Sequence, residues 1–417
     1  MNILHISNTD LTGGRFNGYY MNQSRDKSFN VEMVVWNKES HSSNVHRSPP
    51  DNPALRFFAL NIARIGARLG FDGLTGFSGW ILPSRDYFKR ADVIHLHQIH
   101  NHPNFSILSL PMLMRKKPLV WTIHDPWAMT GGCEHSFECD HWLTGCKTRC
   151  PHPRLKSLFR NYTPYLHWKI KKLVYQHANL TLIVASKWMK DRIERSPLLR
   201  HLPCHQIPFG IDLEVFKPRS KIECRKKLGI TLGHKVIAFR DTDIGKNSKM
   251  SSYKGISYLM EALKIYDPKE STTLLIFENG KGFRILSSKY RVLTPGWIDG
   301  EDLVVALSAA DIFLMPSIQE SFGLMAVEAM ACGTPVIVFD GTSLPDVIKA
   351  PLGGLAVPAK DSIALAEAIK KLMENDELRT RLGKQARQIT EREYSFPLYV
   401  QRHLSLYDEV IERHHRL

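Results

Sequence analysis

The chain has 417 residues, 43% of them hydrophobic, which is enough for two or three globular domains with buried cores. No stretch approaches the roughly 18 consecutive apolar residues of a membrane span, and Met1 runs directly into "NILHIS" without a leader-like basic and apolar region, so we expect a cytoplasmic protein. Residues 1–207 hold 27 Lys and Arg against 14 Asp and Glu, whereas the remainder holds 29 against 27. The N-terminal half should therefore meet an anionic surface, and nucleic acid, acidic phospholipid or a phosphorylated substrate would each fit.

Short β-branched or apolar runs alternate with helical stretches along the whole chain, which is typical of βαβ units in an α/β protein. In the first half the expected strands are residues 2–7, 31–36, 92–97, 118–124 and 180–186. In the second half they are residues 234–239, 272–277, 291–297, 311–316, 335–339 and 354–358. Two similar series predict two doubly wound domains.

The domain boundary is expected in segment 205–218, where Pro208, Gly210 and Pro218 interrupt any helical period. We therefore predict an N-terminal domain over 1–207 and a C-terminal domain over 208–395. The last segment, 396–417, should be an amphipathic helix that packs across both domains, because apolar residues recur at helical spacing: Leu404, Tyr407, Val410 and Ile411.

A basic amphipathic helix is expected over residues 54–71. Its apolar stripe comprises Leu55, Phe58, Ile62, Ile65 and Leu69, flanked by Arg56, Arg64 and Arg68. This pattern fits either a core-facing helix with solvated arginines or an interfacial helix. Because segment 141–190 adds ten basic residues and no acidic one, we expect the N-terminal domain to dock peripherally on the anionic inner face of the plasma membrane.

Two clusters of metal-ligand residue types occur in the N-terminal half. His95, His97, His100 and His102 could suggest a metal site, but the first two share one strand face and a loop follows, so we interpret them as the polar wall of a cleft. The second cluster lies in a Cys-rich insert, 131–151, and comprises Cys133, Cys139, Cys146 and Cys150. A reducing compartment favours a structural thiolate zinc site over disulfides there. The spacing differs from tight C-x2-C pairs, so zinc, free thiols and disulfides all stay open.

The stretch "ESFGLMAVEAMACGT", residues 320–334, predicts an anion site at a helix start. A helix should begin after Gly323, so the N–H groups of Phe322, Gly323 and Leu324 would be donors for a diphosphate. Glu328 would lie roughly 7 Å farther along the axis, where its carboxylate could accept hydrogen bonds from ribose hydroxyls. Glu320, before the helix, would face the hydroxyls of a transferred sugar.

Residues 296–341, which contain this E-x7-E element at Glu320 and Glu328, resemble the C-terminal signature of retaining family-four glycosyltransferases of GT-B architecture. The resemblance continues in order through residues 180–193, 207–218 and 254–263, and the Cys-rich insert is similar to one in a bacterial polysaccharide (colanic-acid-like) subgroup. It implies two Rossmann-like domains facing a cleft, a UDP- or GDP-sugar donor bound between them, and a C-terminal helix that crosses back to the first domain.

The same resemblance implies roles for single residues. Lys254, before Gly255, matches a Lys-Gly pair that contacts the diphosphate, and cations placed there could neutralise the leaving group without a metal. Relatives usually carry an arginine a few residues earlier, whereas here Arg240 lies fourteen positions upstream. His124 matches a histidine near the reacting carbon of the donor sugar.

Two further sets of residues are assigned to donor binding by resemblance. Gly13 and Gly14 match a glycine-rich turn that approaches donor and acceptor, and the helix after them should begin near Asn17 or Gly18. Ser321 belongs to the donor-binding loop together with Phe322.

The resulting hypothesis is a retaining, metal-independent glycosyltransferase that moves a hexose to a glycan or lipid-linked saccharide during bacterial surface polysaccharide synthesis. A sugar phosphorylase or synthase on the same fold is the first alternative. The second is a basic, zinc-containing nucleic-acid-binding protein, which the nearly neutral C-terminal half disfavours, so no nucleic acid partner is expected.

Overall fold

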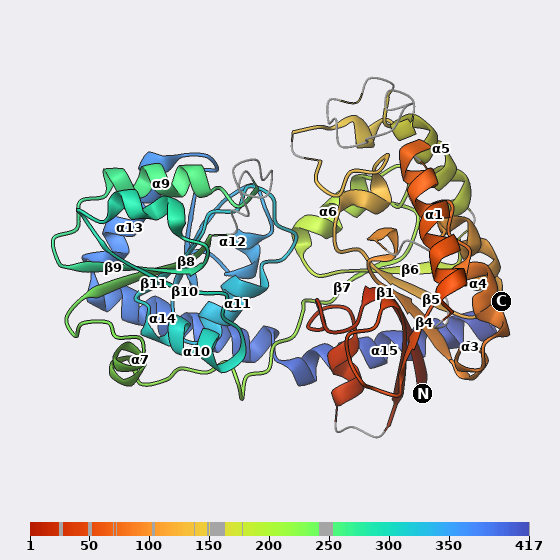
Figure 1. Ribbon diagram of the computed structural model, residues 1–417, viewed down its shortest axis with the longest axis horizontal. Coiled ribbons are helices and arrows are strands. Elements are labelled where there is room, and N and C mark those ends of the chain that lie inside the picture. The colour runs from red at the N-terminus through yellow and green to blue at the C-terminus, as the bar shows by residue number, and fades with distance from the viewer. Residues whose placement is uncertain are drawn as a thin grey trace. The chain divides into compact units, whose positions relative to one another are not determined.

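The computed structural model describes residues 1–24, 28–48, 52–69, 71, 73–101, 105–136, 138–147, 150, 163–176, 178–241 and 253–416. The chain divides into two compact units, and Figure 1 shows that each is an α/β body. Unit 1 comprises Met1–Ile207 and Val400–Leu417, and unit 2 comprises Pro208–Tyr399. Each unit is built on one parallel sheet, which confirms the predicted α/β class.

The sheet of unit 1 has the strand order β3-β2-β1-β4-β5-β6-β7. Its strands are β1 Asn2–Thr9, β2 Asn30–Asn37, β3 Val45–Arg47, β4 Val93–Leu96, β5 Leu119–Thr122, β6 Leu180–Val184 and β7 Cys204–Gln206. The two strands that the sequence did not predict, β3 and β7, form the edges of the sheet. Each has only three residues, too few to establish a period of two.

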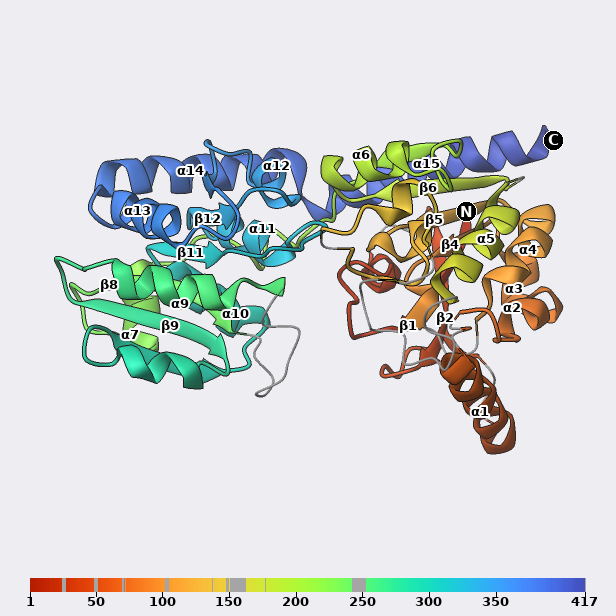
Figure 2. The same ribbon diagram turned by 90° about the horizontal axis from the view of Figure 1, so that it is seen from above.

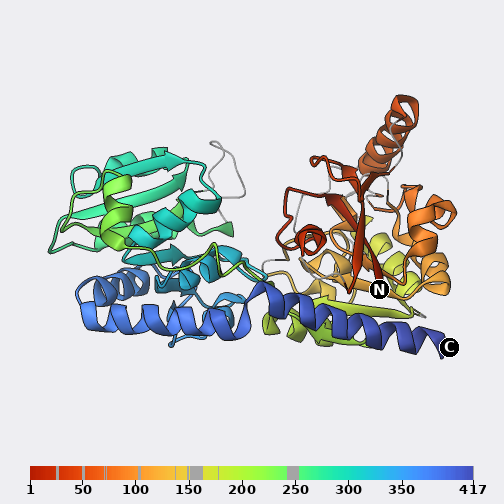
Figure 3. The same cartoon turned by 90° about the horizontal axis from the view of Figure 1, so that it is seen from below.

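The helices of unit 1 are α1 Pro53–Leu69, α2 Ser78–Ile81, α3 Asp86–Arg90, α4 Leu110–Lys116, α5 Thr163–Tyr175, α6 Lys187–Arg195 and most of α15 Phe396–His415. Alternate strand residues serve different faces of the sheet. Leu4 and Ile94 belong to the main hydrophobic core, whereas His95 hydrogen-bonds Tyr407 of α15. Figures 2 and 3 show α15, in blue, running along this sheet.

The sheet of unit 2 has the order β10-β9-β8-β11-β12-β13. Its strands are β8 Lys235–Asp241, β9 Thr272–Glu278, β10 Arg291–Gly296, β11 Ile312–Met315, β12 Val336–Phe339 and β13 Gly354–Val357. All six were expected from the sequence to within a few residues. Residues 274–277 of β9 are completely buried, as continuous apolar strands are when helices cover both faces of a parallel sheet.

The helices of unit 2 are α7 Lys221–Lys227, α9 Ile256–Ile265, α10 Gly300–Ala309, α11 Leu324–Ala331, α12 Leu344–Val347, α13 Ser362–Met373 and α14 Asp376–Glu393. Figure 1 shows α9 and α13 on one face of the sheet, with α7, α10 and α14 on the other. Short 3-10 helices in the two units cover Tyr19–Gln23, Leu82–Ser84, Ile99–Asn101, Ile107–Ser109, Pro126–Met129, His141–Leu143 and Lys281–Leu286.

Helix α1 turns most of its apolar stripe to solvent. Leu55, Phe58 and Ile65 are 43%, 57% and 56% exposed, while the residues of the helix that are fully buried are the small Ala59 and Gly66. The core-facing interpretation of this stripe is therefore wrong. Among the described residues, no helix is both long and apolar enough to cross a bilayer.

Candidate functional site

Each sheet has one point at which the strand order reverses. In unit 2 it lies between β8 and β11, and in unit 1 between β1 and β4. In open α/β sheets, ligands bind outside the carboxyl ends of the strands at this point, because the loops there diverge to opposite faces. Most of the predicted site residues follow strands that border these two points.

The start of α11 follows β11 and depends on a glycine. Gly323 has φ +93°, and a Cβ on it would lie 2.3 Å from a methyl carbon of Leu344, so a larger residue would be both strained and crowded. The first N–H groups of α11 have no acceptor within the helix and carry a partial positive charge. The Phe322 ring is buried against Phe209 and Tyr394, at centroid distances of 5.1 and 5.8 Å, so its backbone rather than its ring could meet a ligand.

An ion pair lies beside this helix start, between the loops that follow β8 and β11. The Lys254 ammonium donates to Oε2 of Glu320 at 2.7 Å, and the two side chains are 30% and 16% exposed. Gly255 permits the approach of the two loops, because it has φ +67° and a Cβ there would lie 2.0 Å from the Pro316 carbonyl oxygen. The structure thus brings together two residues that are 66 positions apart.

Backbone hydrogen bonds fix both members of the pair. The carbonyl of Tyr253 accepts from the N–H of Ile318 at 2.7 Å, which joins the segment before Lys254 to the loop after β11. The Ser343 hydroxyl donates to the carbonyl of Glu320 at 3.0 Å. These bonds fix the backbone of the two loops that carry the ion pair.

Glu328 lies inside α11 and is completely buried, as is its neighbour Ala329. A buried carboxylate is tolerated only among polar partners. Burial raises the pKa of the nearby Cys332 thiol to about 12, and the Glu328 charge acts in the same direction. Ser321, on the preceding loop, is partly buried. The ribose-binding role of Glu328 stays a prediction.

Arg240 is placed near the end of β8, on the side of β9 and β10. Its guanidinium donates to the carbonyl of Ile298 at 3.1 Å and lies 4.5 Å from the centre of the Trp297 ring. Glu278 is close by: burial raises the pKa of its carboxyl group, and the Arg240 charge opposes that shift. The enlarged loop between Arg240 and Lys254 lies largely outside the described residues. A diphosphate role for Arg240 stays a prediction.

In unit 1, the glycine turn after β1 meets the residue that follows β5. Gly13 has φ +79°, and a Cβ on it would lie 2.6 Å from the Phe16 ring. Gly14 donates its N–H to the carbonyl of Leu11 at 2.9 Å. The Phe16 ring packs against His124 at a centroid distance of 5.3 Å. The helix after the turn begins at Tyr19, slightly later than expected, and is a 3-10 helix.

His124 is held in an environment that favours a neutral ring. Burial lowers its pKa to about 4, although the Asp125 carboxylate opposes that shift. Asp125 caps the 3-10 helix Pro126–Met129 by accepting from the Trp127 N–H at 2.8 Å, and it lies 3.2 Å from Nε2 of His100. A neutral imidazole can donate one hydrogen bond and accept another.

The predicted cleft wall of histidines is wrong for His95 and His97, which are 0% and 1% exposed. They face the interior on the α15 side of the sheet, where His5 pairs with His95 across β1 and β4. His102 lies outside the described residues. The sequence analysis missed His5, although its place in a buried strand in register with a histidine-containing strand was the available signal.

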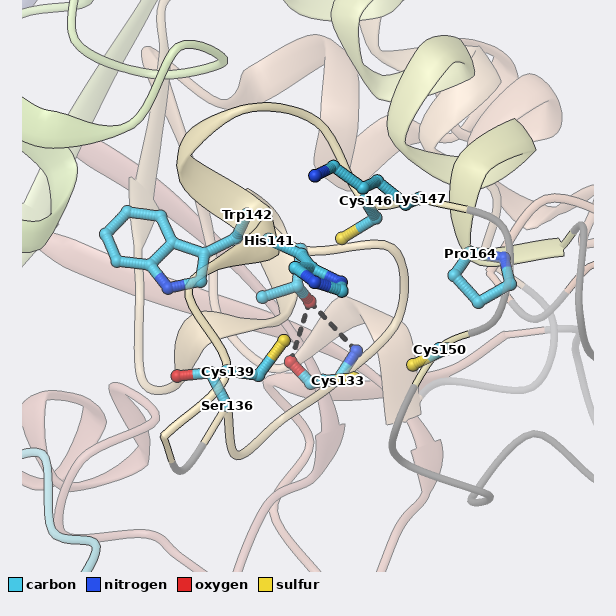
Figure 4. A pocket seen from close by; sticks show the side chains of 10 residues that line it. Cys133, Ser136, Cys139, His141, Trp142, Cys146, Lys147, Cys150 and Pro164 are labelled. Carbon is cyan, nitrogen blue, oxygen red and sulfur yellow. Dashed lines mark hydrogen bonds between the residues drawn. The ribbon is translucent and has the colours of Figure 1, made fainter.

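The four clustered cysteines line one pocket. In Figure 4 the sulfur atoms of Cys139, Cys146 and Cys150 point into the same space, where His141 also lies. None of the seven cysteines, all of which are described, forms a disulfide. Cys133 shares a hydrogen bond with Cys150, which together with burial raises the pKa of its thiol, and burial raises that of Cys146 to about 11.

A fit test for a metal gives different results for the thiols and for the histidines. Within the described part of the chain, the ligand atoms of three residues lie within 4.8 Å of one another only for His5, His95 and His97. Among the described residues, no three thiols of the cysteine pocket meet this distance, although Cys133 and Cys150 are close enough to share a hydrogen bond. A zinc ion there would have to draw them together.

Two family profiles cover most of the chain. The profile "Glycosyltransferase Family 4" matches residues 38–215, and the profile "Glycosyl transferases group 1" matches residues 240–389. The gap between the two matches, residues 216–239, begins shortly after the boundary between the two units at Ile207 and Pro208. Together with the paired parallel sheets, these matches define the GT-B class of glycosyltransferase folds. The chain belongs to glycosyltransferase family 4, group 1.

Individual proteins agree with this class. The D-inositol 3-phosphate glycosyltransferase of Corynebacterium glutamicum is 32% identical over 219 residues, which are 48% of this chain and 50% of that protein. The matches thus span about half the length of the curated relatives. Sucrose-phosphate synthase from Thermosynechococcus elongatus superposes with a TM-score of 0.69 at 19% identity, over 99% of this chain and all of that one. The Anabaena protein HepE in complex with UDP-glucose gives 0.60 at 14% identity over the full length of both chains.

Proposed function

We propose that this protein transfers a hexose, with retention of configuration, from a nucleoside-diphosphate sugar to a glycan or lipid-linked saccharide of a bacterial surface polysaccharide. The observation that carries the proposal is the Lys254–Glu320 pair beside the start of α11. The Lys254 ammonium and the backbone N–H groups at the start of α11 lie next to each other near the switch point of the sheet. Ligands of open α/β sheets bind at such points, and helix N-termini favour anions. An anionic leaving group would be stabilised there.

Each residue would have a distinct task. Lys254 and the N–H groups of Phe322–Leu324 would stabilise the charge that develops on the diphosphate as the glycosidic bond breaks. These groups supply positive charge without a metal ion. Glu320 would accept hydrogen bonds from hydroxyls of the transferred sugar, Glu328 would bind the ribose, and His124 would act near the reacting carbon.

The acceptor would attack the same face that the diphosphate leaves, with the leaving phosphate taking the acceptor's proton. No covalent glycosyl-enzyme is needed for this route to retention. Gly13 and Gly14 would allow close approach of the turn after β1 to the substrates, since their neighbours leave no room for a side chain at Gly13. Arg240 would add a second cation to the diphosphate site.

The nucleotide can be tested directly. A thermal-shift panel of UDP-, GDP- and ADP-sugars should show stabilisation by one nucleotide, and UDP-glucose is the first choice because HepE, which has a similar fold, was solved with it. The shift should disappear in Glu328→Ala and persist in Glu377→Ala, a control at an exposed position of α14. Equal thermal shifts in both variants would show that Glu328 does not contact the nucleotide.

A sugar synthase or phosphorylase is the second candidate, favoured by the similarity to the fold of sucrose-phosphate synthase. Turnover that requires inorganic phosphate would indicate a phosphorylase. A free sugar or sugar phosphate as the best acceptor would indicate a synthase.

We further propose that the acceptor is reached at a membrane surface through α1 and α5. The exposed apolar residues Leu55, Phe58 and Ile65 of α1 and Leu173 of α5 would enter the interface, while arginines of α1 would meet anionic headgroups. The C-terminal end of α1 lies near α5, since Phe71 stacks on a histidine of that helix.

Flotation with liposomes tests this surface. Binding should be stronger to vesicles of phosphatidylcholine with phosphatidylglycerol than to phosphatidylcholine alone. It should weaken in Phe58→Ser but not in Trp297→Ser, which removes an exposed aromatic residue from unit 2. Equal binding to both vesicle types would contradict the proposal.

A structural zinc ion in the cysteine pocket is a separate proposal, supported by the four thiols that line it. Zinc would require their deprotonation and would cross-link the insert internally. Protein purified without chelator should contain about one equivalent of zinc, lost in Cys139→Ser and retained in Cys204→Ser. Metal-free protein of full stability would contradict it.

A further inference from the structure

A row of histidines lies between the sheet of unit 1 and α15. Four of them are buried and come from β1, from the end of β4 and from α15: His5, His95, His97 and His403. The fifth, His124 after β5, is partly buried. The ring centroids of His95 and His97 are 4.2 Å apart, and those of His97 and His124 are 5.5 Å apart. Imidazoles are seldom buried in such numbers without a shared polar arrangement.

Three of these rings form a chain of hydrogen bonds. Nδ1 of His5 lies 2.8 Å from Nε2 of His97, and Nδ1 of His97 lies 3.3 Å from Nε2 of His124. The chain therefore runs from the interior of the sheet to His124, the residue proposed to act near the donor sugar. Gly18 makes room for its inner end, because a Cβ there would lie 2.3 Å from Nδ1 of His5.

His95 belongs to the cluster but not to the chain. Its Nε2 hydrogen-bonds the hydroxyl of Thr122 at 2.7 Å, and its Nδ1 hydrogen-bonds that of Tyr407 at 2.6 Å. The ring is thus fixed by α15 and β5, and it packs on His97. A metal ion bound by His5, His95 and His97 would have to break at least one hydrogen bond of each of the last two. The observed distances favour the hydrogen-bonded chain.

The direction of the chain sets the tautomer of its last ring. A bond between two ring nitrogens joins one N–H to one bare nitrogen, and a neutral ring has one of each. Burial keeps the rings neutral, since it lowers the pKa of His5 to about 3. Nε2 of His5 is buried and has no hydrogen-bond partner among the described residues. A buried N–H group without an acceptor is less well tolerated than a buried unprotonated nitrogen without a donor. Nε2 of His5 should therefore be unprotonated, and Nδ1 should carry the proton.

We propose that His97 is a positioning residue that holds His124 as the Nδ1–H tautomer. His5 donates from Nδ1 to His97, and His97 donates from its own Nδ1 to Nε2 of His124. The proton of His124 is then on Nδ1, where it is available as a hydrogen-bond donor to an oxygen of the donor sugar. This last step rests on the proposed function, whereas the tautomer itself does not.

Nuclear magnetic resonance of protein labelled with ¹⁵N-histidine measures the tautomer. In the wild type, the long-range ¹H–¹⁵N correlations of His124 should show a protonated Nδ1 and a bare Nε2. In His97→Phe, these signals should move toward the average of two tautomers. In His97→Gln, whose amide N–H can still donate, they should stay near the wild-type pattern. The control His201→Gln changes a histidine outside the cluster that bonds the Tyr175 carbonyl.

Kinetics add a second readout. His97→Phe should lower kcat by about tenfold or more with little change in KM, because a ring in the wrong tautomer presents a lone pair in place of a donor. His97→Gln should recover most of that loss. If His97→Phe does not fold, the kcat and the His124 tautomer are compared in His5→Gln and His97→Gln. Each of these variants keeps a side-chain donor and acceptor at its position in the chain of hydrogen bonds.

Two results would overturn the proposal. One is a His124 tautomer that is unchanged in His97→Phe. The other is a one-to-one shift of the His5, His95 and His97 signals on adding Zn²⁺, which would identify a metal site. A tautomer that moves as expected in a protein whose transfer activity ignores both His97→Phe and His124→Ala would support the positioning and refute the proposed role of His124.

Discussion

The two units share one architecture, but the candidate site of unit 2 contains an ion pair whereas that of unit 1 contains neutral histidine rings. At the switch point of unit 2, Lys254 and Glu320 form an ion pair whose side chains are partly exposed. At that of unit 1, the rings of the buried His5 and the partly buried His124 lie near the glycine turn, and desolvation lowers the pKa of each so that the rings are neutral. A charged pair suits the binding of an anionic diphosphate, whereas neutral rings suit the orientation of uncharged sugar hydroxyls. Under the proposed function, unit 2 would stabilise the charge of the nucleotide sugar and unit 1 would orient its hydroxyls.

The largest expected effect is on the charged site. Lys254→Ala should lower kcat/KM by about a thousandfold, because it removes a fixed cation from the developing charge of the diphosphate. Steady-state transfer assays measure this. Lys264→Ala, which removes the lysine of an exposed ion pair with Glu261, is the matched control and should leave activity unchanged. Similar kcat/KM values for the two variants would show that Lys254 does not stabilise the leaving diphosphate.

The neutral site should make unit 1 sensitive to acid. The pKa of His5 is lowered to about 3 and that of His124 to about 4, each mainly by burial. Between those values and 6.5, the unfolded chain binds protons that the folded unit does not, so stability is full above about pH 6.5 and falls as the pH falls. From pH 7 to pH 5, each histidine should remove about 2 kcal/mol.

Urea unfolding followed by peptide-resolved hydrogen exchange, at pH 7 and pH 5, separates the two units. Peptides of unit 1 should lose protection at lower urea at pH 5, while those of unit 2 should change little. A parallel loss in both units would show that the buried histidines do not distinguish them.

Backbone geometry at the charged site gives an intermediate effect. Gly323→Ala should destabilise unit 2 by about 1–3 kcal/mol, since it forces a strained φ and places a methyl group against Leu344. Gly341→Ala is the comparison, because Gly341 also has positive φ but no heavy atom within 4 Å of the added Cβ. Thermal unfolding of both variants measures the difference. Equal destabilisation would mean that the Leu344 contact contributes nothing.

The smallest effect is expected at Arg240. Its guanidinium already stacks on Trp297 and donates to the carbonyl of Ile298, so it contributes to the site from farther along the sheet edge. Arg240→Ala should lower kcat/KM by about tenfold, well short of Lys254→Ala. A loss of kcat/KM as large as that of Lys254→Ala would mean that Arg240 contributes as much to diphosphate binding as Lys254 does. The Arg240 side chain would then have to leave its present contacts in the complex.

The sequence predicted the central strands and the start of α11 because those features depend on local patterns. Runs of apolar residues establish buried strands, and Gly323 after a loop marks a helix start. The edge strands β3 and β7 were missed because three residues carry no period. The domain organisation and the roles of the site residues stay predictions.

The sequence did not predict side-chain contacts between residues that are far apart along the chain. The Lys254–Glu320 contact spans 66 positions, and that of His95 with Tyr407 spans 312. Such contacts depend on the strand order and on which face α15 covers. The buried histidines were therefore assigned to a cleft wall, although they alternate in strands as core residues do.

The most direct test of the central claim is a crystal structure of the protein with UDP or the nucleotide that the thermal-shift panel selects. We expect diphosphate oxygens within hydrogen-bond distance of the Lys254 ammonium and of the N–H groups at the start of α11, with the ribose at Glu328. A nucleotide bound elsewhere, with the Lys254–Glu320 pair undisturbed and the helix start empty, would contradict the account.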